Sequence, residues 1–158
     1  MDAHNKMGNN IIYIDESDFS VDMPRTRGWS AKGTRCPGTA DWNAKGRTNA
    51  IGAITGGKFV NVCLAQGNID SRVFHKWLTS QLLPCLTALS VLVMDNATFH
   101  KHKDTLEAIQ RAGHVVEFLP PYSPDLNPIE RKWAQAKAIR RKHRCSVDEL
   151  FSKYVIYL

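Results

Sequence analysis

Short apolar runs in the first half of the chain predict β-strands. Residues 10–15 are apolar almost throughout and end in an acid, Asp15, which is typical of a buried strand with an acid at its far end. A brief second strand is predicted at 19–21. The following stretch, 24–47, is rich in glycine and basic residues and too long for a tight connection, so it predicts a functional or flexible loop.

A β-hairpin is the clearest local prediction. Residues 48–55 and 58–64 are extended, β-rich runs, and only Gly56-Gly57 separates them. Two glycines tolerate the positive φ angles that the tightest hairpin turns require. We therefore expect these two runs to pair as antiparallel strands.

The second half of the chain alternates helical and extended patterns. Apolar residues recur at helical spacing in several segments that capping residues, glycine or proline bound, and two short apolar runs lie between them. The predicted elements are a helix from 71 to the residue before Pro84, a strand at 91–94, a helix at 101–112, a strand at 115–119, a helix at 128–143 and a last helix from 146.

This order of elements predicts one α/β domain over residues 1–158. Strands joined by a tight turn pair antiparallel, whereas strands separated by helices favour parallel pairing. The expected fold is therefore a mixed sheet, with early antiparallel strands, later parallel strands and helices on both faces.

Composition narrows the class of protein. The 158 residues are 43% hydrophobic and 23% charged, as in soluble globular domains. No apolar run reaches the length of a membrane span, and the first ten residues lack the apolar core of a signal peptide. We therefore expect a cytoplasmic protein without a membrane partner.

Basic residues gather in two segments. The net charge is +6, and of the 21 lysines and arginines six lie in 24–47 and seven in 131–144. Such clusters indicate contact with phosphate backbones, although a solvated helix face and loop would show the same pattern. The predicted DNA-binding residues are Arg27, Lys32, Arg131, Lys132, Lys137, Arg140, Arg141 and Lys142.

Three acids occupy comparable positions at the ends of predicted elements. Asp15 ends the first strand, Asp95 follows strand 91–94, and Glu130 opens helix 128–143. Sites in sheets with parallel strands form beyond the carboxyl ends of the strands, so we expect these acids to face one crevice. Crowded carboxylates need a cation, and oxygen-only ligands favour Mg²⁺ or Mn²⁺. A pair of such ions would suit phosphoryl transfer.

The segment before Glu130 is stiff. Four prolines lie within the nine residues 120–128, where they fix φ and remove backbone donors. Asn127 is a good N-cap and Pro128 suits the first helical position, which places Glu130 on a first turn with little freedom. The alternative is that Glu130 only closes a capping box onto the Asn127 amide.

The other acids also have ordinary interpretations. Asp15 could be a simple strand-end acid, and Asp95 with Asn96 could form an Asx turn. Glu16 and Asp18 are spare candidates for which solvent is the expected environment.

Three polar residues, Asn96, His100 and Asn127, are candidates for supporting roles beside the acids. His100 follows Asp95 closely and could orient a metal ligand or touch phosphate. A histidine at a helix start is nevertheless expected at the surface.

Three motifs carry a specific resemblance. They are Ile-Asp-Glu-Ser at 14–17, Met-Asp-Asn-Ala at 94–97 with His100, and Pro-Pro-Tyr-Ser-Pro-Asp-Leu-Asn-Pro-Ile-Glu-Arg-Lys-Trp at 120–133. Together they resemble the catalytic domain of mariner-type DDE transposases, more narrowly the bacterial insertion-sequence branch. The 34 residues between Asp95 and Glu130 are the spacing that names one group of this superfamily.

The resemblance implies a ribonuclease-H-like fold in which Asp15, Asp95 and Glu130 bind Mg²⁺ or Mn²⁺, with two ions. It also implies an enzyme that cleaves DNA at insertion-sequence ends and transfers the strand to target DNA, in the cytoplasm of a bacterium and at its nucleoid. Arg27-Gly28-Trp29 lies where relatives carry a loop that can brace a partner subunit, which implies a homodimer.

The front of the chain departs from the family pattern. Relatives carry helix-turn-helix domains ahead of the first catalytic aspartate, and only fourteen residues precede Asp15 here. We therefore expect a separately encoded helix-turn-helix subunit, a frameshift fusion, a fragment or a degenerate copy. Two other functions stay open, a general metal-dependent nuclease with this fold and a non-catalytic basic DNA-binding remnant in which Glu130 is only a cap.

Overall fold

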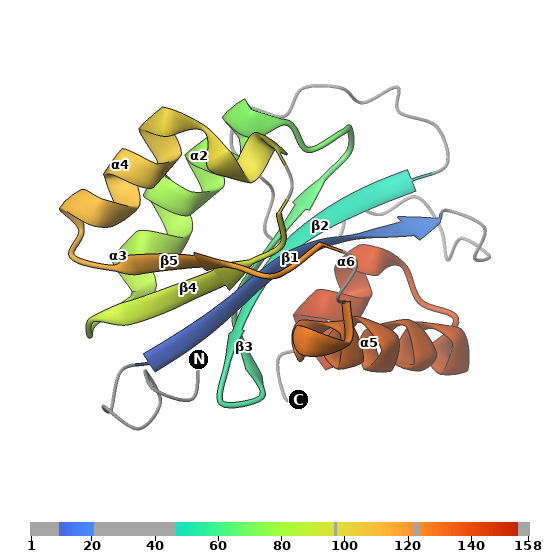
Figure 1. Ribbon diagram of the computed structural model, residues 1–158. Coiled ribbons are helices and arrows are strands. Elements are labelled where there is room, and N and C mark those ends of the chain that lie inside the picture. Colours follow the sequence, from blue (N-terminus) through green and yellow to red (C-terminus); the bar gives the residue numbers. More distant parts are fainter. Residues whose placement is uncertain (1–9, 21–46, 97, 122–123, 155–158) are drawn as a thin grey trace.

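The computed structural model describes residues 10–20, 47–96, 98–121 and 124–154, and within them five strands form one mixed sheet in the order β3-β2-β1-β4-β5 (Figure 1). β1 pairs antiparallel with β2 and parallel with β4; β2 and β3 are antiparallel, and β4 and β5 are parallel. This arrangement confirms the predicted α/β mixed sheet. The strands are β1 Asn10–Ser20, β2 Arg47–Thr55, β3 Lys58–Ala65, β4 Ser90–Met94 and β5 Val115–Phe118.

β1 is longer than predicted, and Asp15 lies in its middle instead of at its end. Its pairing with β2 runs from Tyr13 to Ser20, whereas its pairing with β4 ends at Tyr13. The polar residues after Ile14 resemble a strand end in sequence, but β2 continues to satisfy their backbone groups, so the two predicted strands are one. Asp15 therefore lies just beyond the point where β4 leaves the side of β1. The predicted loop at 24–47 falls, apart from its last residue, outside the described residues.

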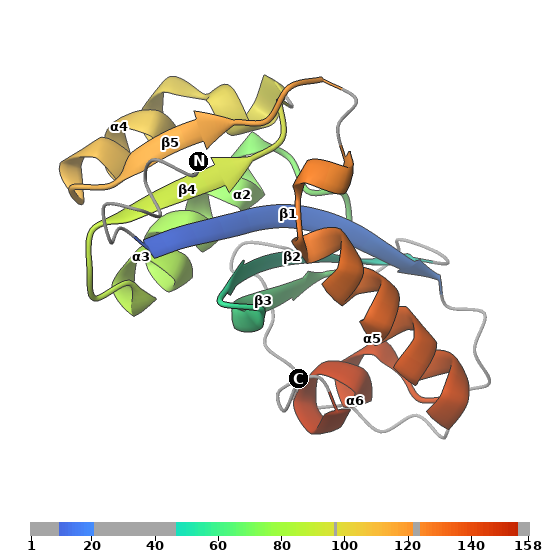
Figure 2. The ribbon, with the colours of Figure 1, turned by 60° about the horizontal axis from the view of Figure 1, so that its bottom comes forward.

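Helices α2 Ser71–Trp77 and α4 Lys103–Arg111 cover one face of the sheet (Figures 1 and 2). α2 continues through a π-helical segment, η1 Leu78–Leu82, into α3 Leu83–Cys85. The helix was predicted to end before Pro84, but this proline lies in the first turn of α3, so the helical run continues past it. The core on this face includes Ile12, Ile14, Ile51, Phe74, Trp77, Leu82 and Met94.

The other face is covered by α5 Ile129–His143, followed by α6 Val147–Glu149 and the π-helical segment η4 Leu150–Tyr154 (Figure 2). A second core lies between these helices and the sheet and includes Phe19, Ile54, Leu64, Ile129, Trp133 and Phe151. Gly52 of β2 is essential to this packing, because a Cβ there would lie 2.6 Å from Cη2 of Trp133. The absence of that side chain lets α5 approach the sheet closely. Two 3₁₀ turns, η2 Thr98–Lys101 and η3 Pro124–Leu126, complete the described elements.

Candidate active site

Asp15 and Glu16 are consecutive on β1, so their side chains lie on opposite faces of the sheet. Tyr13, two residues before Asp15, packs on the core beneath α5, and Ile14, two residues before Glu16, packs in the core beneath α2 and α4. Asp95 directly follows the last residue of β4, beside this part of β1. The sheet therefore distributes the acids of the first two motifs over two faces.

Asp15 contacts Glu130 on the face that α5 covers. Asp15 is only 8% exposed, and its side chain shares a hydrogen bond with the Glu130 side chain on the first turn of α5. Burial is the main cause that raises the pKa of Asp15 from 3.8 to about 9; the hydrogen bond to Glu130 and the charges of Glu16 and Glu130 add to it. At neutral pH and without a cation, Asp15 therefore keeps its proton.

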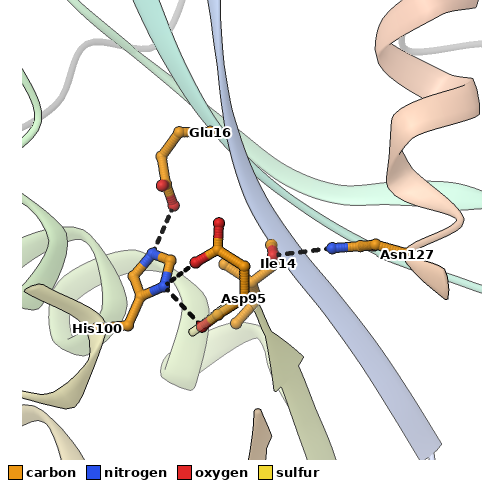
Figure 3. Close-up of polar contacts among 5 residues, drawn as sticks. All are labelled: Ile14, Glu16, Asp95, His100 and Asn127. Atoms are coloured by element: carbon orange, nitrogen blue, oxygen red, sulfur yellow. Dashed lines mark hydrogen bonds and ion pairs between the residues drawn. The ribbon is translucent and has the colours of Figure 1, made fainter. Parts of the chain in front are cut away.

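Asn127 joins the start of α5 to β1. Its Oδ1 accepts a hydrogen bond from the Ile129 N–H at 3.2 Å, and its Nδ2 donates to the Ile14 carbonyl at 3.4 Å (Figure 3). The side chain is buried, at 3% exposed. Because Ile14 precedes Asp15, this link holds the first turn of α5 against β1 where Glu130 meets Asp15. The helix begins at Ile129, one residue later than predicted.

His100 links Asp95 to Glu16 (Figure 3). Its Nδ1 lies 2.8 Å from Asp95 Oδ1, and its Nε2 lies 2.9 Å from Glu16 Oε2. Nδ1 also lies 3.3 Å from the Asp95 carbonyl oxygen. The imidazole is fully buried, and its centroid is 4.5 Å from that of the Phe74 ring.

The two carboxylates make His100 a cation. Burial alone lowers its pKa, but the hydrogen bonds to Asp95 and Glu16, together with their charges, raise the pKa to about 10. At neutral pH the ring is therefore an imidazolium, and both of its N–H groups donate to carboxylates.

Two expectations about these residues were wrong. His100 was expected at the surface, but the 3₁₀ turn that carries it packs on Phe74 and places the ring in the interior. Glu16 was expected in solvent, but it is half-buried and bound to His100. The alternation of β1 offers the missed signal, because Glu16 follows Ile12 and Ile14 on the same, buried face. Asn96 is exposed.

The predicted DNA-binding residues of α5 differ in their environments. Arg131, Arg141 and Lys142 are exposed, while Lys132 and Lys137 are half-buried, the latter with Nζ 5.3 Å from the centre of the Phe19 ring. Arg27 and Lys32 lie outside the described residues.

Arg140 departs from the prediction. It is 8% exposed, and its Nε donates a hydrogen bond to the Cys145 carbonyl at 3.2 Å. It therefore stabilises the chain reversal after α5, where Arg144 adopts a left-handed conformation. The spacing explains why Arg140 is buried, because it lies seven residues after Trp133 and so on the same, buried face of the helix.

Part of the predicted metal-binding triad fits a divalent cation. Buried Asp15 and exposed Glu130 form a carboxyl pair, and a hard cation can replace the proton on Asp15. Asp95 uses Oδ1 for His100, and its second oxygen points away from the ring (Figure 3). Among the described residues, no three acidic, histidine or cysteine side chains are grouped so as to hold an ion.

The model of the family described as DDE superfamily endonuclease matches residues 10–150. Because this match covers most of the chain, the protein belongs to the DDE superfamily endonucleases, as the motifs predicted. Comparison with curated proteins yields no match.

Solved structures share the fold. The Mos1 transposase catalytic domain with raltegravir and Mn is 14% identical, with a TM-score of 0.67 over 97% of this chain and 72% of that chain. The Mos1 paired-end complex with the left transposon end is 18% identical, with a TM-score of 0.64, and a simian T-cell lymphotropic virus intasome in complex with a PP2A regulatory subunit is 15% identical, with a TM-score of 0.60.

These matches have two consequences. They confirm the predicted ribonuclease-H-like fold, and they show the extent of the match: 88% of this chain covers 45% of the Mos1 chain in the paired-end complex, and 85% covers 41% of the intasome chain. This chain therefore spans less than half of each. In the part of the chain that the structure describes, no helix has the length and hydrophobicity of a membrane-spanning segment.

Proposed function

We propose that this chain is the catalytic domain of a transposase, which cleaves DNA at the ends of a mobile element and joins the freed 3′ ends to target DNA. The observation that carries the proposal is the contact between buried Asp15 and exposed Glu130, two acids that the family resemblance assigns to one metal site. Similar structures include Mos1 transposase with a transposon end, with Mn and with Mg, which supports DNA as substrate and these ions as cofactors.

In this proposal, Asp15, Asp95 and Glu130 would hold two Mg²⁺ or Mn²⁺ ions. When bound, the ions would activate the attacking oxygen and stabilise the leaving oxygen of a phosphodiester. Other residues of the chain would position these ligands: Asn127 keeps α5 against β1, and His100 holds Asp95. No covalent intermediate with the protein is required.

DNA would lie along the basic residues of α5. Arg131, Arg141 and Lys142 are exposed and available to phosphates, and the half-buried Lys132 and Lys137 belong to the same helix. The active complex would contain two copies of the chain. Recognition of the element's ends would come from a separately encoded helix-turn-helix subunit or a fusion.

Metal binding and strand cleavage test the catalytic proposal. We expect the wild-type chain to bind Mn²⁺, measured by electron paramagnetic resonance of the free ion, and to nick supercoiled plasmid with Mn²⁺ or Mg²⁺. Asp15→Asn, Asp95→Asn and Glu130→Gln each remove one anionic ligand, so Mn²⁺ binding should weaken and nicking should fall below detection. Glu107→Gln on α4, an acid on the other side of the sheet, should behave as wild type.

Two outcomes would contradict the proposal. DNA binding without Mn²⁺ binding or nicking would instead support the non-catalytic DNA-binding remnant. Wild-type nicking by Asp95→Asn would show that Asp95 is structural.

Salt dependence tests the DNA-binding surface. Replacing Arg141 and Lys142 by Gln should flatten the slope of log affinity against log salt by up to about 2, since each phosphate contact contributes about 0.9. The matched control is Lys103→Gln with Arg111→Gln, which removes two exposed charges from α4. An unchanged slope in the α5 variant would show that this end of the helix is only solvated surface.

A further inference from the structure

Asp95 occupies a position that does not by itself define the direction of its carboxylate. It follows the last residue of β4, beyond the strand pairing, and its side chain is 50% exposed. A half-exposed side chain retains rotamer freedom, whereas a ligand of a metal site must keep one orientation. The contact with His100 supplies a restraint, because Nδ1 binds both the carboxylate and the carbonyl oxygen of Asp95.

His100 can orient Asp95 only if the ring itself is held. One of its faces rests on Phe74, and its Nε2 edge meets Glu16 at 2.9 Å. Glu16 belongs to the part of β1 that pairs with β2, where it lies opposite Ile51, so the sheet fixes its backbone. The link therefore runs from the sheet through Glu16 and the imidazole to Asp95, over a sequence separation of 84 residues between Glu16 and His100.

We propose that Glu16 is a positioning residue: from the face of β1 opposite Asp15, it holds His100 and through it fixes the carboxylate of Asp95. This inference rests on the proposed function, because it takes Asp95 as a metal ligand. Glu16 itself lies on the other face of the sheet from Asp15 and Glu130. The two neighbouring acids of β1 thus have different roles: Asp15 is itself a metal ligand, and Glu16 holds another ligand, Asp95, in place through His100.

The physical reason is the set of hydrogen bonds around a buried ring. With Glu16 and Asp95 as acceptors, the ring is fixed at both nitrogen atoms. Without the acceptor at residue 16, the Nε2 side of this buried ring loses its hydrogen bond to Glu16, so the ring is held less firmly. Partners of this kind, one step removed from a metal, typically change metal affinity or activity about 10- to 100-fold when they are removed.

The test compares two substitutions of equal length in the full chain. Glu16→Met removes the acceptor, whereas Glu16→Gln keeps an oxygen that can accept the Nε2–H bond. We expect Glu16→Met to weaken Mn²⁺ binding by about 10- to 100-fold, and Glu16→Gln to stay closer to wild type. Asp18→Asn, an exposed acid two residues along the same face, controls for the loss of negative charge and should bind Mn²⁺ as wild type.

A double-substitution cycle shows whether Glu16 acts through Asp95. In an Asp95→Asn background, Glu16→Met should have little further effect on Mn²⁺ affinity, because the residue that Glu16 positions is no longer an anionic ligand. His100→Gln replaces Nε2 but leaves no donor at Nδ1, so it should also weaken binding. This second variant tests the same link if Glu16→Met does not fold, which thermal unfolding in EDTA will show.

The outcomes separate the inference from the proposed function. If Asp95→Asn weakens Mn²⁺ binding but Glu16→Met and His100→Gln do not, the positioning role is overturned and the metal site stands. If Glu16→Gln binds Mn²⁺ as poorly as Glu16→Met, Glu16 acts by its charge and not by holding His100. If Asp95→Asn binds Mn²⁺ as wild type, the assignment of Asp95 to the metal fails.

Discussion

Asp15 and Glu16 are adjacent on β1, but each side chain meets a different kind of partner. Asp15 meets a second acid, Glu130, and the pKa of Asp15 rises to about 9 because burial and a neighbouring acid oppose its charge. Glu16 meets His100, a buried imidazolium that also binds Asp95. Among the residues that the structure describes, His100 therefore supplies a counter-charge to the acid on one face of the strand, and no cation is seen to do so for Asp15 on the other.

The difference supports the proposed metal site at Asp15 and Glu130. The arrangement of Glu16, His100 and Asp95 already contains its positive charge, so it is stable as it is. Beside Glu130, Asp15 has no such partner among the described residues and keeps its proton instead. A buried acid held against a second acid is typical of functional sites, because stability alone would not select it.

The largest loss of stability is expected when His100, the cation that binds Glu16 and Asp95, is removed. His100→Leu keeps the volume but removes the cation, leaving a half-buried Glu16 carboxylate without its partner. We expect a loss of about 3 kcal/mol in the free energy of unfolding, measured by urea denaturation. His102→Leu, an exposed histidine two residues later, should change stability by less than about 0.5 kcal/mol.

A second substitution tests the cause of this loss. Adding Glu16→Leu to His100→Leu removes the unpaired carboxylate and should restore much of the stability, because replacing both partners is far less costly than replacing one. A double variant as unstable as the single one would show that packing around the ring, and not its charge, is what stabilises the fold.

A smaller effect is expected at the glycine that lets α5 approach the sheet. Gly52→Ala places a Cβ 2.6 Å from Cη2 and 2.9 Å from Cζ2 of Trp133, so α5 must shift. We expect a loss of about 2 kcal/mol. Weaker Mn²⁺ binding should accompany it, because Glu130 moves with the helix while Asp15 stays on β1.

The matched rescue uses the partner of the contact. Trp133→Leu removes the ring atoms that meet the new methyl group, so Gly52→Ala should cost less stability in that background. Equal costs in both backgrounds would show that the close approach of Trp133 is not the constraint at this glycine.

Much of this arrangement could be predicted from the sequence, and the exceptions share a cause. The Gly56-Gly57 hairpin and the helix after the proline-rich segment depend on neighbouring residues, and both are found where expected. The length of β1 depends on β2, which lies far along the chain. Pairing with β2 keeps the polar residues after Ile14 in the strand, whereas the local sequence pattern predicts that the strand ends there.

The environments of His100, Glu16 and Arg140 show the same limit at the level of side chains. Glu16 and His100 meet because β1 and β4 are neighbours in the sheet, and only the strand order reveals this. Arg140 belongs to a run of basic residues, and the charge pattern alone predicted an exposed residue, although Arg140 lies on the buried face of α5. Periodicity was the better guide for Glu16 and Arg140, since both follow buried residues at the regular spacing of their elements.

A change of opposite sign, a gain in stability, is expected on the face of β1 that carries Asp15. The folded chain keeps a proton on Asp15 up to a pH of about 9, whereas the unfolded chain loses it near 3.8. The folded state therefore binds more protons between these values, so the free energy of unfolding falls as pH rises through this window. Asp15→Asn removes this dependence, so the metal-free variant should be more stable than wild type at neutral pH. The gain should be larger at pH 8 than at pH 5 in urea denaturation with EDTA, and Asp18→Asn should show no such trend. Saturating Mn²⁺ should reverse the order of stability, because an ion stabilises the folded chain that binds it and the variant has lost a ligand. A metal-free Asp15→Asn chain that is less stable than wild type at pH 8 would show that the Asp15 carboxyl group contributes to folding, and the contrast between the two faces of β1 would not hold.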